Sequence, residues 1–157
     1  MMMFIKVKRD VTIKARECAD GRKQCKKYNN ADVTSPTLST EGLLMYVVIN
    51  AYEERDVVVM DIPGACISAD MDNDVFIIFH GTMAELMVAA NPTIYRKNIS
   101  YGKKGESLLY VRIQKALYGC LKSALLFYGK FVGDLEAHGF EIKPYDMCVE
   151  NKSVRVK

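Results

Sequence analysis

Near the middle of the chain, an aspartate directly follows an apolar run. Asp61 ends the stretch "VVVMD" of residues 57–61, and a Pro63-Gly64 turn comes just after it. A carboxylate in this place can cap a tight turn. It can also hold a divalent cation at the end of a strand, because magnesium prefers hard oxygen ligands. The local sequence leaves both roles open.

A second group of residues with chemical potential is basic and lies near the N-terminus. Residues 6–27 contain nine Lys and Arg residues against three Asp and Glu residues. Such a patch can attract phosphate by electrostatics alone, although basic stretches are commonly only a solvated surface. The net charge of the 157 residues is +3, which is too mild to indicate nucleic-acid binding by itself.

The thiols and imidazoles show no metal-ligand spacing. The chain has five scattered cysteines, no Cys-x-x-Cys pair and two histidines, so a zinc site is not expected. Cysteines without a pairing pattern indicate free thiols in a reducing compartment. The N-terminus has too few apolar residues for a signal peptide, and no run approaches the roughly 18 of a membrane helix. The sequence predicts a soluble intracellular protein, cytoplasmic rather than nuclear, not secreted and with no membrane partner.

The elements that would position these residues include both strands and helices. Residues 4–9 and 13–19 alternate apolar and charged side chains, which predicts an antiparallel pair with its basic side chains on one face. After a polar loop, a helix opens at residues 35–37. It carries an apolar stripe expected to face the core, made of Leu43, Leu44, Val47, Val48 and Ala51. Residues 57–60 are continuously apolar, which predicts a strand covered on both faces.

The rest of the chain continues this mixture. Residues 75–79 and 108–113 are expected to form strands, and residues 82–91 a short helix. A long helix is expected with an apolar stripe from Leu125 to Leu135 and an end at Gly139. Residues 148–150 and 154–156 are expected to form a C-terminal hairpin. The sequence therefore predicts an α+β fold, in which the basic hairpin can form a separate lobe.

Three segments, in this order, resemble the reverse transcriptase of copia-type (Ty1-like) retrotransposons. They read "IKARECADGRKQ", "VVVMDIPGACISADMDNDVFI" and "VRIQKALYGCLKSALLFYGKFVGDLEAHGFEIKPYDMCVENK". The similarity spans about residues 4–152. It implies a partial fingers/palm domain over residues 1–157, with a mixed, mainly antiparallel sheet and packed helices. Residues 4–34 would form a fingers-like basic hairpin and loop, and residues 35–157 the fingers/palm core.

The resemblance also gives the aspartate a role. Asp61 matches the first metal-binding aspartate of the family, and the backbone carbonyl of Ile62 stands where a second oxygen ligand is expected. The family joins nucleotides with two divalent cations that clamp the attacking and leaving oxygens. The implied cofactor is Mg²⁺, and the implied partners are an RNA template, a DNA primer and a deoxynucleoside triphosphate.

Five further positions are implied to contact nucleotide or template. Lys14 and Arg16 match basic fingers positions that face the triphosphate or the template, and both residue types suit phosphate. Tyr118 and Gly119 match the segment that lines the nucleotide pocket. Cys66 stands where the family has a bulky aromatic residue that screens the 2′ position of the sugar, so a working enzyme with Cys66 would discriminate less against ribonucleotides.

The sequence departs from the family in its carboxylates. The other two catalytic carboxylates of the family belong to an Asp-Asp motif, and no Asp-Asp pair occurs in these 157 residues. The thumb, the RNase H domain and the remaining polyprotein segments are not found either. We therefore expect a truncated reverse transcriptase that does not polymerise DNA alone. The alternatives are a nucleic-acid-binding remnant without catalysis, or the non-functional product of a pseudogene.

Overall fold

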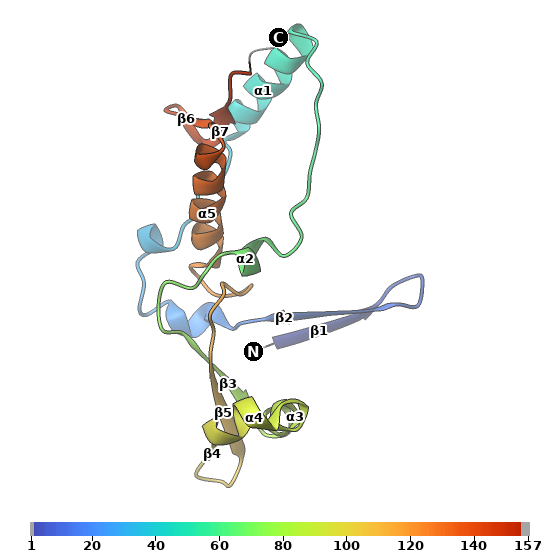
Figure 1. Ribbon diagram of the computed structural model, residues 1–157, viewed down its shortest axis with the longest axis vertical. Coiled ribbons are helices and arrows are strands. Elements are labelled where there is room, and N and C mark those ends of the chain that lie inside the picture. Colours follow the sequence, from blue (N-terminus) through green and yellow to red (C-terminus); the bar gives the residue numbers. More distant parts are fainter. Residues whose placement is uncertain (1, 155–157) are drawn as a thin grey trace.

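The computed structural model describes residues 2–154, without the side chains of residues 2, 3, 17, 23 and 30. Three small antiparallel sheets organise the chain (Figure 1). The first pairs β1 (Met2–Val7) with β2 (Ile13–Cys18), and the second has the order β3-β5-β4, formed by Phe76–His80, Ser107–Arg112 and Ile99–Tyr101. The third pairs β6 (Glu141–Lys143) with β7 (Asp146–Asn151). The prediction of a mixed fold with antiparallel strands is confirmed.

Five α-helices and three short 3-10 turns complete the described chain. They are α1 (Thr40–Tyr52), α2 (Ala65–Ser68), α3 (Thr82–Ala90), α4 (Pro92–Tyr95), α5 (Ser123–Ala137), η1 (Gly21–Gln24), η2 (Asn30–Asp32) and η3 (Arg96–Asn98). In Figure 1, α1, α5 and the third sheet lie at one end, and the second sheet with α3 and α4 lies at the other. The β1-β2 hairpin projects sideways between them. No helix in the described part of the chain has the length and apolar character needed to cross a bilayer.

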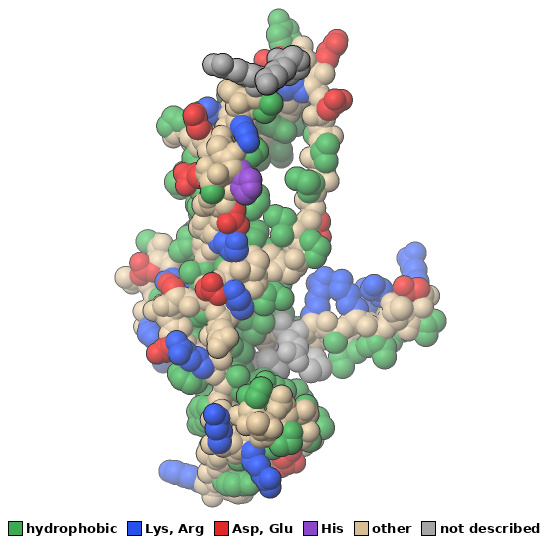
Figure 2. Space-filling view, viewed as in Figure 1, with side chains coloured by type: hydrophobic (Ala, Val, Ile, Leu, Met, Phe, Trp, Pro, Cys, Tyr) green, Lys and Arg blue, Asp and Glu red, His purple; other side chains and the backbone are tan. Residues whose placement is uncertain are grey.

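The β1-β2 hairpin separates basic from apolar side chains, as the period-two pattern predicts. In its register Lys6 lies opposite Lys14 and Phe4 opposite Arg16, whereas Ile5 lies opposite Ala15. Because opposite residues share a face of the sheet and neighbours alternate, the three basic side chains lie on one face. Figure 2 shows Lys and Arg along one side of the hairpin and hydrophobic side chains along the other.

A small core lies between the second sheet and α3. Phe79 of β3 and Leu109 of β5 are directly opposite each other, and Ala84 of α3 is buried against them. Leu109 is fully buried. The predicted strands at residues 75–79 and 108–113 are thereby confirmed, because their alternating side chains have this helix to pack against.

The end of α5 is fixed by a glycine, as the sequence predicts. Gly139 has φ +82° and donates to the carbonyl of Glu136, while Phe140 donates to that of Leu135; this is the left-handed C-terminal cap that glycine favours. The predicted hairpin after residue 148 is wrong where the structure describes it. Instead, β7 pairs with the preceding strand, β6, to which residues 144–145 connect it. Residues 155–156 lie outside the described residues.

The predicted strand at residues 57–60 is also wrong. Figure 1 shows them within an open connection that is not paired with any described strand, and their exposed fractions run from 56% to 93%. A strand is completed only by hydrogen bonds to a neighbour, and no described strand lies beside this segment. Helix α1 starts at Thr40, later than predicted, because Ser39 caps it. Its apolar residues, expected in the core, are largely exposed, as Leu43, Val47 and Val48 show at 49%, 55% and 65%.

Candidate functional site

A pocket of about 710 Å³ opens where the base of the hairpin meets two loops. One wall comes from β2, a second from the turn before α2, and a third from the loop before α5. The lining residues are Lys14, Arg16, Cys18, Asp61, Ile62, Pro63, Gly64, Ile67, Leu117 and Tyr118. Five of the seven residues that the resemblance marks as site residues are therefore brought together, although they come from segments far apart in the sequence.

The strand β2 places two cations in this pocket. Lys14, Arg16 and Cys18 alternate along the strand and all line the pocket, because every second residue of a strand faces the same side. Within the described residues, no carboxylate pairs with Lys14 or Arg16. Lys14 also lies directly opposite Lys6, and like charges in that position repel each other. A bound anion would relieve this repulsion.

Asp61 is presented to the pocket by a turn that it does not cap. Gly64 adopts φ +68° at the start of α2, a left-handed conformation that glycine takes without strain. The Asp61 side chain is exposed, and no hydrogen bond or ion pair joins it to any residue that the structure describes. Of the two roles that the sequence leaves open, capping of the turn is thus not observed, and the carboxylate is available to a ligand.

A contact between backbones locks the hairpin against the third wall of the pocket. The amide of Ala19, just after β2, donates to the carbonyl of Tyr118 over 2.7 Å. Gly119 has φ +90°, and a Cβ atom there would lie 2.1 Å from the Ala19 carbonyl oxygen. A Cβ atom on Gly21 would in turn lie 2.3 Å from the Gly119 carbonyl oxygen. The two glycines therefore permit the approach that holds Lys14 and Arg16 in place.

Two of the implied site residues are not among the described residues that line the pocket. Gly119 does not line the pocket, but its contact with Ala19 positions the neighbouring wall residue, Tyr118. Cys66 is buried within α2, at 9% exposure, while the next residue, Ile67, lines the pocket and is half exposed. Successive residues of a helix point about 100° apart, which explains why one faces inward and the other outward. The role of Cys66 beside the sugar stays a prediction.

The carboxylates present do not fit a two-cation site. Asp61 is the one acidic residue among those that line the pocket, and no group of three or more His, Cys, Asp or Glu residues that could hold a metal occurs in the described chain. Mg²⁺ is usually held by one or two carboxylates together with substrate phosphates. A single aspartate does not build the paired-ion clamp of nucleotidyl transfer, so the described residues of this pocket do not fit that pair of ions.

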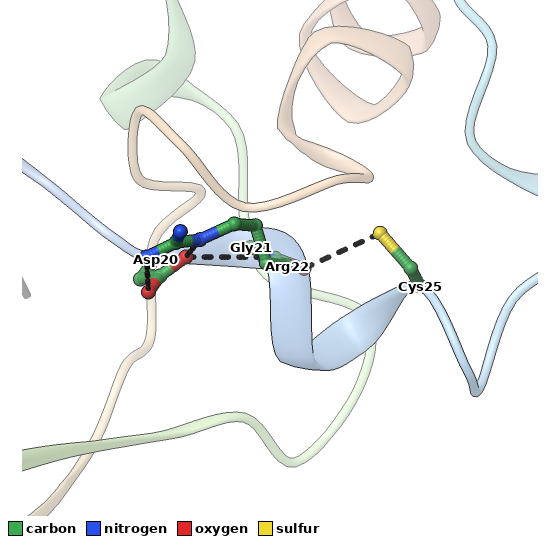
Figure 3. Close-up of polar contacts among 4 residues, drawn as sticks. All are labelled: Asp20, Gly21, Arg22 and Cys25. Atoms are coloured by element: carbon green, nitrogen blue, oxygen red, sulfur yellow. Dashed lines mark hydrogen bonds and ion pairs between the residues drawn. The ribbon is translucent and has the colours of Figure 1, made fainter.

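Part of the basic N-terminal segment is neutralised internally, which a count of its charges does not show. Figure 3 shows Asp20 and Arg22 at the start of η1. Nε and Nη2 of Arg22 each donate to the Asp20 carboxylate over 2.8 Å, and the Arg22 amide also donates to it over 3.3 Å. These bonds hold the pKa of Asp20 at about 2. The signal was the Asp-Gly-Arg order itself, typical of a side chain that caps a turn.

A second ion pair lies at the start of α5. Lys122 pairs with Asp72 and stands 5.8 Å from the centre of the Tyr28 ring. The hydrogen bond to Asp72 is the main cause that raises the pKa of Lys122. Like Arg22, this cation is occupied. Lys14 and Arg16 are the cations that the pocket leaves to a ligand.

Comparisons of the chain with protein-family models, with curated proteins and with solved structures give no match.

Proposed function

We propose that this chain is a fingers/palm portion of a copia-type reverse transcriptase, and that its pocket binds the phosphates of a nucleotide or of a template–primer. One observation carries the proposal. Residues from three separate segments that resemble this family, among them Lys14, Asp61 and Tyr118, line one pocket. A chance resemblance of three segments gives no reason for their marked residues to meet.

The chemistry of the pocket suits phosphate next to a base. The Arg16 guanidinium can bind two phosphate oxygens at once, and the Lys14 ammonium adds a compact charge. Tyr118 is 45% exposed at the rim, and an exposed aromatic ring there can stack on a base without reading its sequence. Asp61 faces the same space, so a bare polyphosphate would meet one repulsive charge.

The test is binding of a fluorescent RNA–DNA template–primer, measured by anisotropy over a series of salt concentrations. Because phosphate contacts release counterions, affinity should fall steeply as salt rises. The double variant K14Q/R16Q should reduce the slope of log K against log salt by about two. The matched control, K103Q/K104Q, changes the same charge in the loop between β4 and β5 and should leave the slope nearly unchanged. Equal slopes in both double variants would contradict the proposal.

Catalysis is tested separately. Because the pocket presents one carboxylate, we expect no Mg²⁺-dependent primer extension by the chain alone, which favours binding without polymerisation. The control is Asp61→Asn in the same assay. Extension that disappears in D61N would mean that a further carboxylate completes the site, and binding alone would no longer describe the function.

A further inference from the structure

The chain exposes far more surface than a folded monomer of its size. Its accessible surface is 12545 Å² for a mass of 17.7 kDa. A compact monomer of that mass exposes about 7,900 Å². The surplus, about 4,600 Å², exceeds what one subunit buries in a standard protein–protein interface, about 800 Å².

Much of this surplus is apolar and lies on two consecutive segments. Helix α1 is hydrophobic around its whole circumference, and its large apolar residues from Leu43 to Tyr52 are 43% to 88% exposed. A helix of this kind is normally buried. Residues 57–60 follow it with three valines and a methionine, also exposed. Figure 1 shows this connection between α1 and α2 running alone along one side of the molecule.

The connection has the properties of a strand that lacks its neighbour. Valine strongly favours strands. The backbone of residues 57–60 forms no helix or turn and makes no backbone hydrogen bond within the described chain. An extended segment of this type binds another strand through its main chain and alternate side chains. A partner for this segment must be an apolar strand whose charges at the two ends complement Arg55 and Asp61.

The chain itself supplies such a strand. In an antiparallel pairing of two copies about Val58, residue 57 lies opposite residue 59 of the other copy, and Arg55 lies opposite Asp61. The two-fold axis repeats the latter pair, so both ends of the ladder carry opposite charges. A two-fold symmetric ladder must be centred on a residue that lies opposite its own copy, so the neighbouring registers are centred on Val57 and Val59. The first places Glu53 opposite Asp61, which is repulsive, and the second places Val57 opposite Asp61 and loses the ion pair. The charges therefore favour the register about Val58.

We propose that this chain forms a two-fold symmetric dimer, in which residues 55–61 of two copies pair as antiparallel strands and α1 packs along the same interface. The pair Arg55–Glu53, which joins neighbouring exposed residues of one chain, must open to free Arg55. Exposed pairs of this kind contribute little to stability, so the exchange costs little. The interface is isologous and therefore closes on itself.

A charge-swap experiment tests the register directly. The variants Arg55→Asp and Asp61→Arg should each be monomeric by sedimentation or light scattering, because each places like charges at both ends of the ladder. Mixed in equal amounts they should form a heterodimer, since every end then carries one Asp and one Arg. The matched pair K103D and E106R, in the loop between β4 and β5, should each remain dimeric, whether mixed or not.

Crosslinking gives a second readout that does not depend on breaking the dimer. Val58 lies opposite its own copy, where Cα atoms are about 4.5–5.5 Å apart, a spacing that a disulfide accepts. Val58→Cys should therefore give more oxidised dimer than the five native cysteines do. Val59→Cys should not, because its copy lies two residues away along the ladder, at about 7–8 Å.

Two outcomes would overturn the dimer. One is a wild-type chain that remains a folded monomer at 100 μM, which would mean that another polypeptide covers this surface. The other is an oligomer that persists unchanged in R55D and D61R. The variant K14Q/R16Q should lose phosphate binding and keep the dimer, so failure of either property can be told from failure of the other.

Discussion

The carboxylate of Asp146 binds Ser39, the N-cap residue of α1, which lies 107 residues earlier in the chain. Oδ2 of Asp146 accepts from the Ser39 amide over 3.1 Å and from its hydroxyl over 3.0 Å. The Ser39 hydroxyl in turn accepts from the Gly42 amide over 3.0 Å. Asp146 therefore fastens β7 to the N-terminus of α1 by a direct side-chain link.

Removal of this cap should weaken the attachment of α1. Ser39→Ala deletes the hydroxyl that bonds both Gly42 and Asp146, and loss of an N-cap costs about 1 kcal/mol. The free energy of unfolding, measured by urea titration, should fall by that amount. Thr37→Ala, an exposed hydroxyl two residues before the cap, is the control and should change stability little. Equal stability of S39A and the wild type would contradict the role of the cap.

The Asp20–Arg22 pair should make stability fall in acid. The pKa of Asp20 is about 2 in the folded chain because Arg22 bonds its charged form, against about 3.9 when unfolded. A lowered folded pKa means that the contribution is full above pH 4 and is lost as the pH falls from about 4 towards 2. Thermal midpoints measured over pH 2 to 6 should show this loss.

The variant Asp20→Asn should flatten that part of the pH profile. Arg22→Gln should flatten it in the same way, because it removes the cause of the lowered pKa, and the double variant should add nothing further. If the two single variants had additive effects, the carboxylate and the guanidinium would not be acting as one pair.

The close approach of Gly119 to Ala19 should be intolerant of a methyl group. Gly119→Ala places a Cβ atom 2.1 Å from the Ala19 carbonyl oxygen at φ +90°, so it should cost more than the roughly 1–2 kcal/mol of left-handed strain alone. Gly105→Ala is the matched control, since Gly105 has φ +77° with nothing within 4 Å of its Cβ position. Chemical denaturation should rank G119A well below G105A, and equal losses would contradict the contact.

The Asp61 carboxylate should weaken the affinity for a nucleotide without Mg²⁺ and strengthen it when Mg²⁺ is present. In EDTA, Asp61→Asn removes a charge that repels phosphate, and affinity for a deoxynucleoside triphosphate should rise about fivefold, as for one pair of unit charges 4 Å apart in water. In Mg²⁺, the wild type should gain affinity and D61N should gain less. Titration calorimetry under both conditions measures this, and an identical Mg²⁺ gain in both proteins would exclude Asp61 as a ligand.

Local patterns predicted the elements whose partners lie nearby in the sequence. The hairpin β1-β2 follows from alternation on two strands separated by a short turn, where Asp10 accepts from the amide and hydroxyl of Thr12. The end of α5 follows from Gly139. Both depend on interactions a few residues apart, which a sequence displays directly.

The predictions that failed concern strands whose partners no sequence pattern identifies. Residues 57–60 have the composition of a buried strand, but a strand forms only where another is placed beside it. The strand β6 is three residues long, too short for an alternation pattern, so the sequence predicts the wrong neighbour for β7. In the site, the resemblance marks Lys14, Arg16 and Asp61, whereas the contact between Gly119 and Ala19 joins residues far apart in the sequence, which no local pattern displays.

The bare connection between α1 and α2 also has the shape that proteases accept as a substrate. A protease binds its substrate as an extended strand, and exposed loops are preferred sites of nicking. The run of valines ending in Met60 would suit an enzyme with a small apolar specificity pocket. A cut there would leave α1 held to β7 by the cap at Ser39 but would sever it from Asp61 and the pocket. We therefore expect the backbone groups proposed to recognise a second copy to make an unpaired chain a substrate for proteolysis, and pairing would then set how much of it survives.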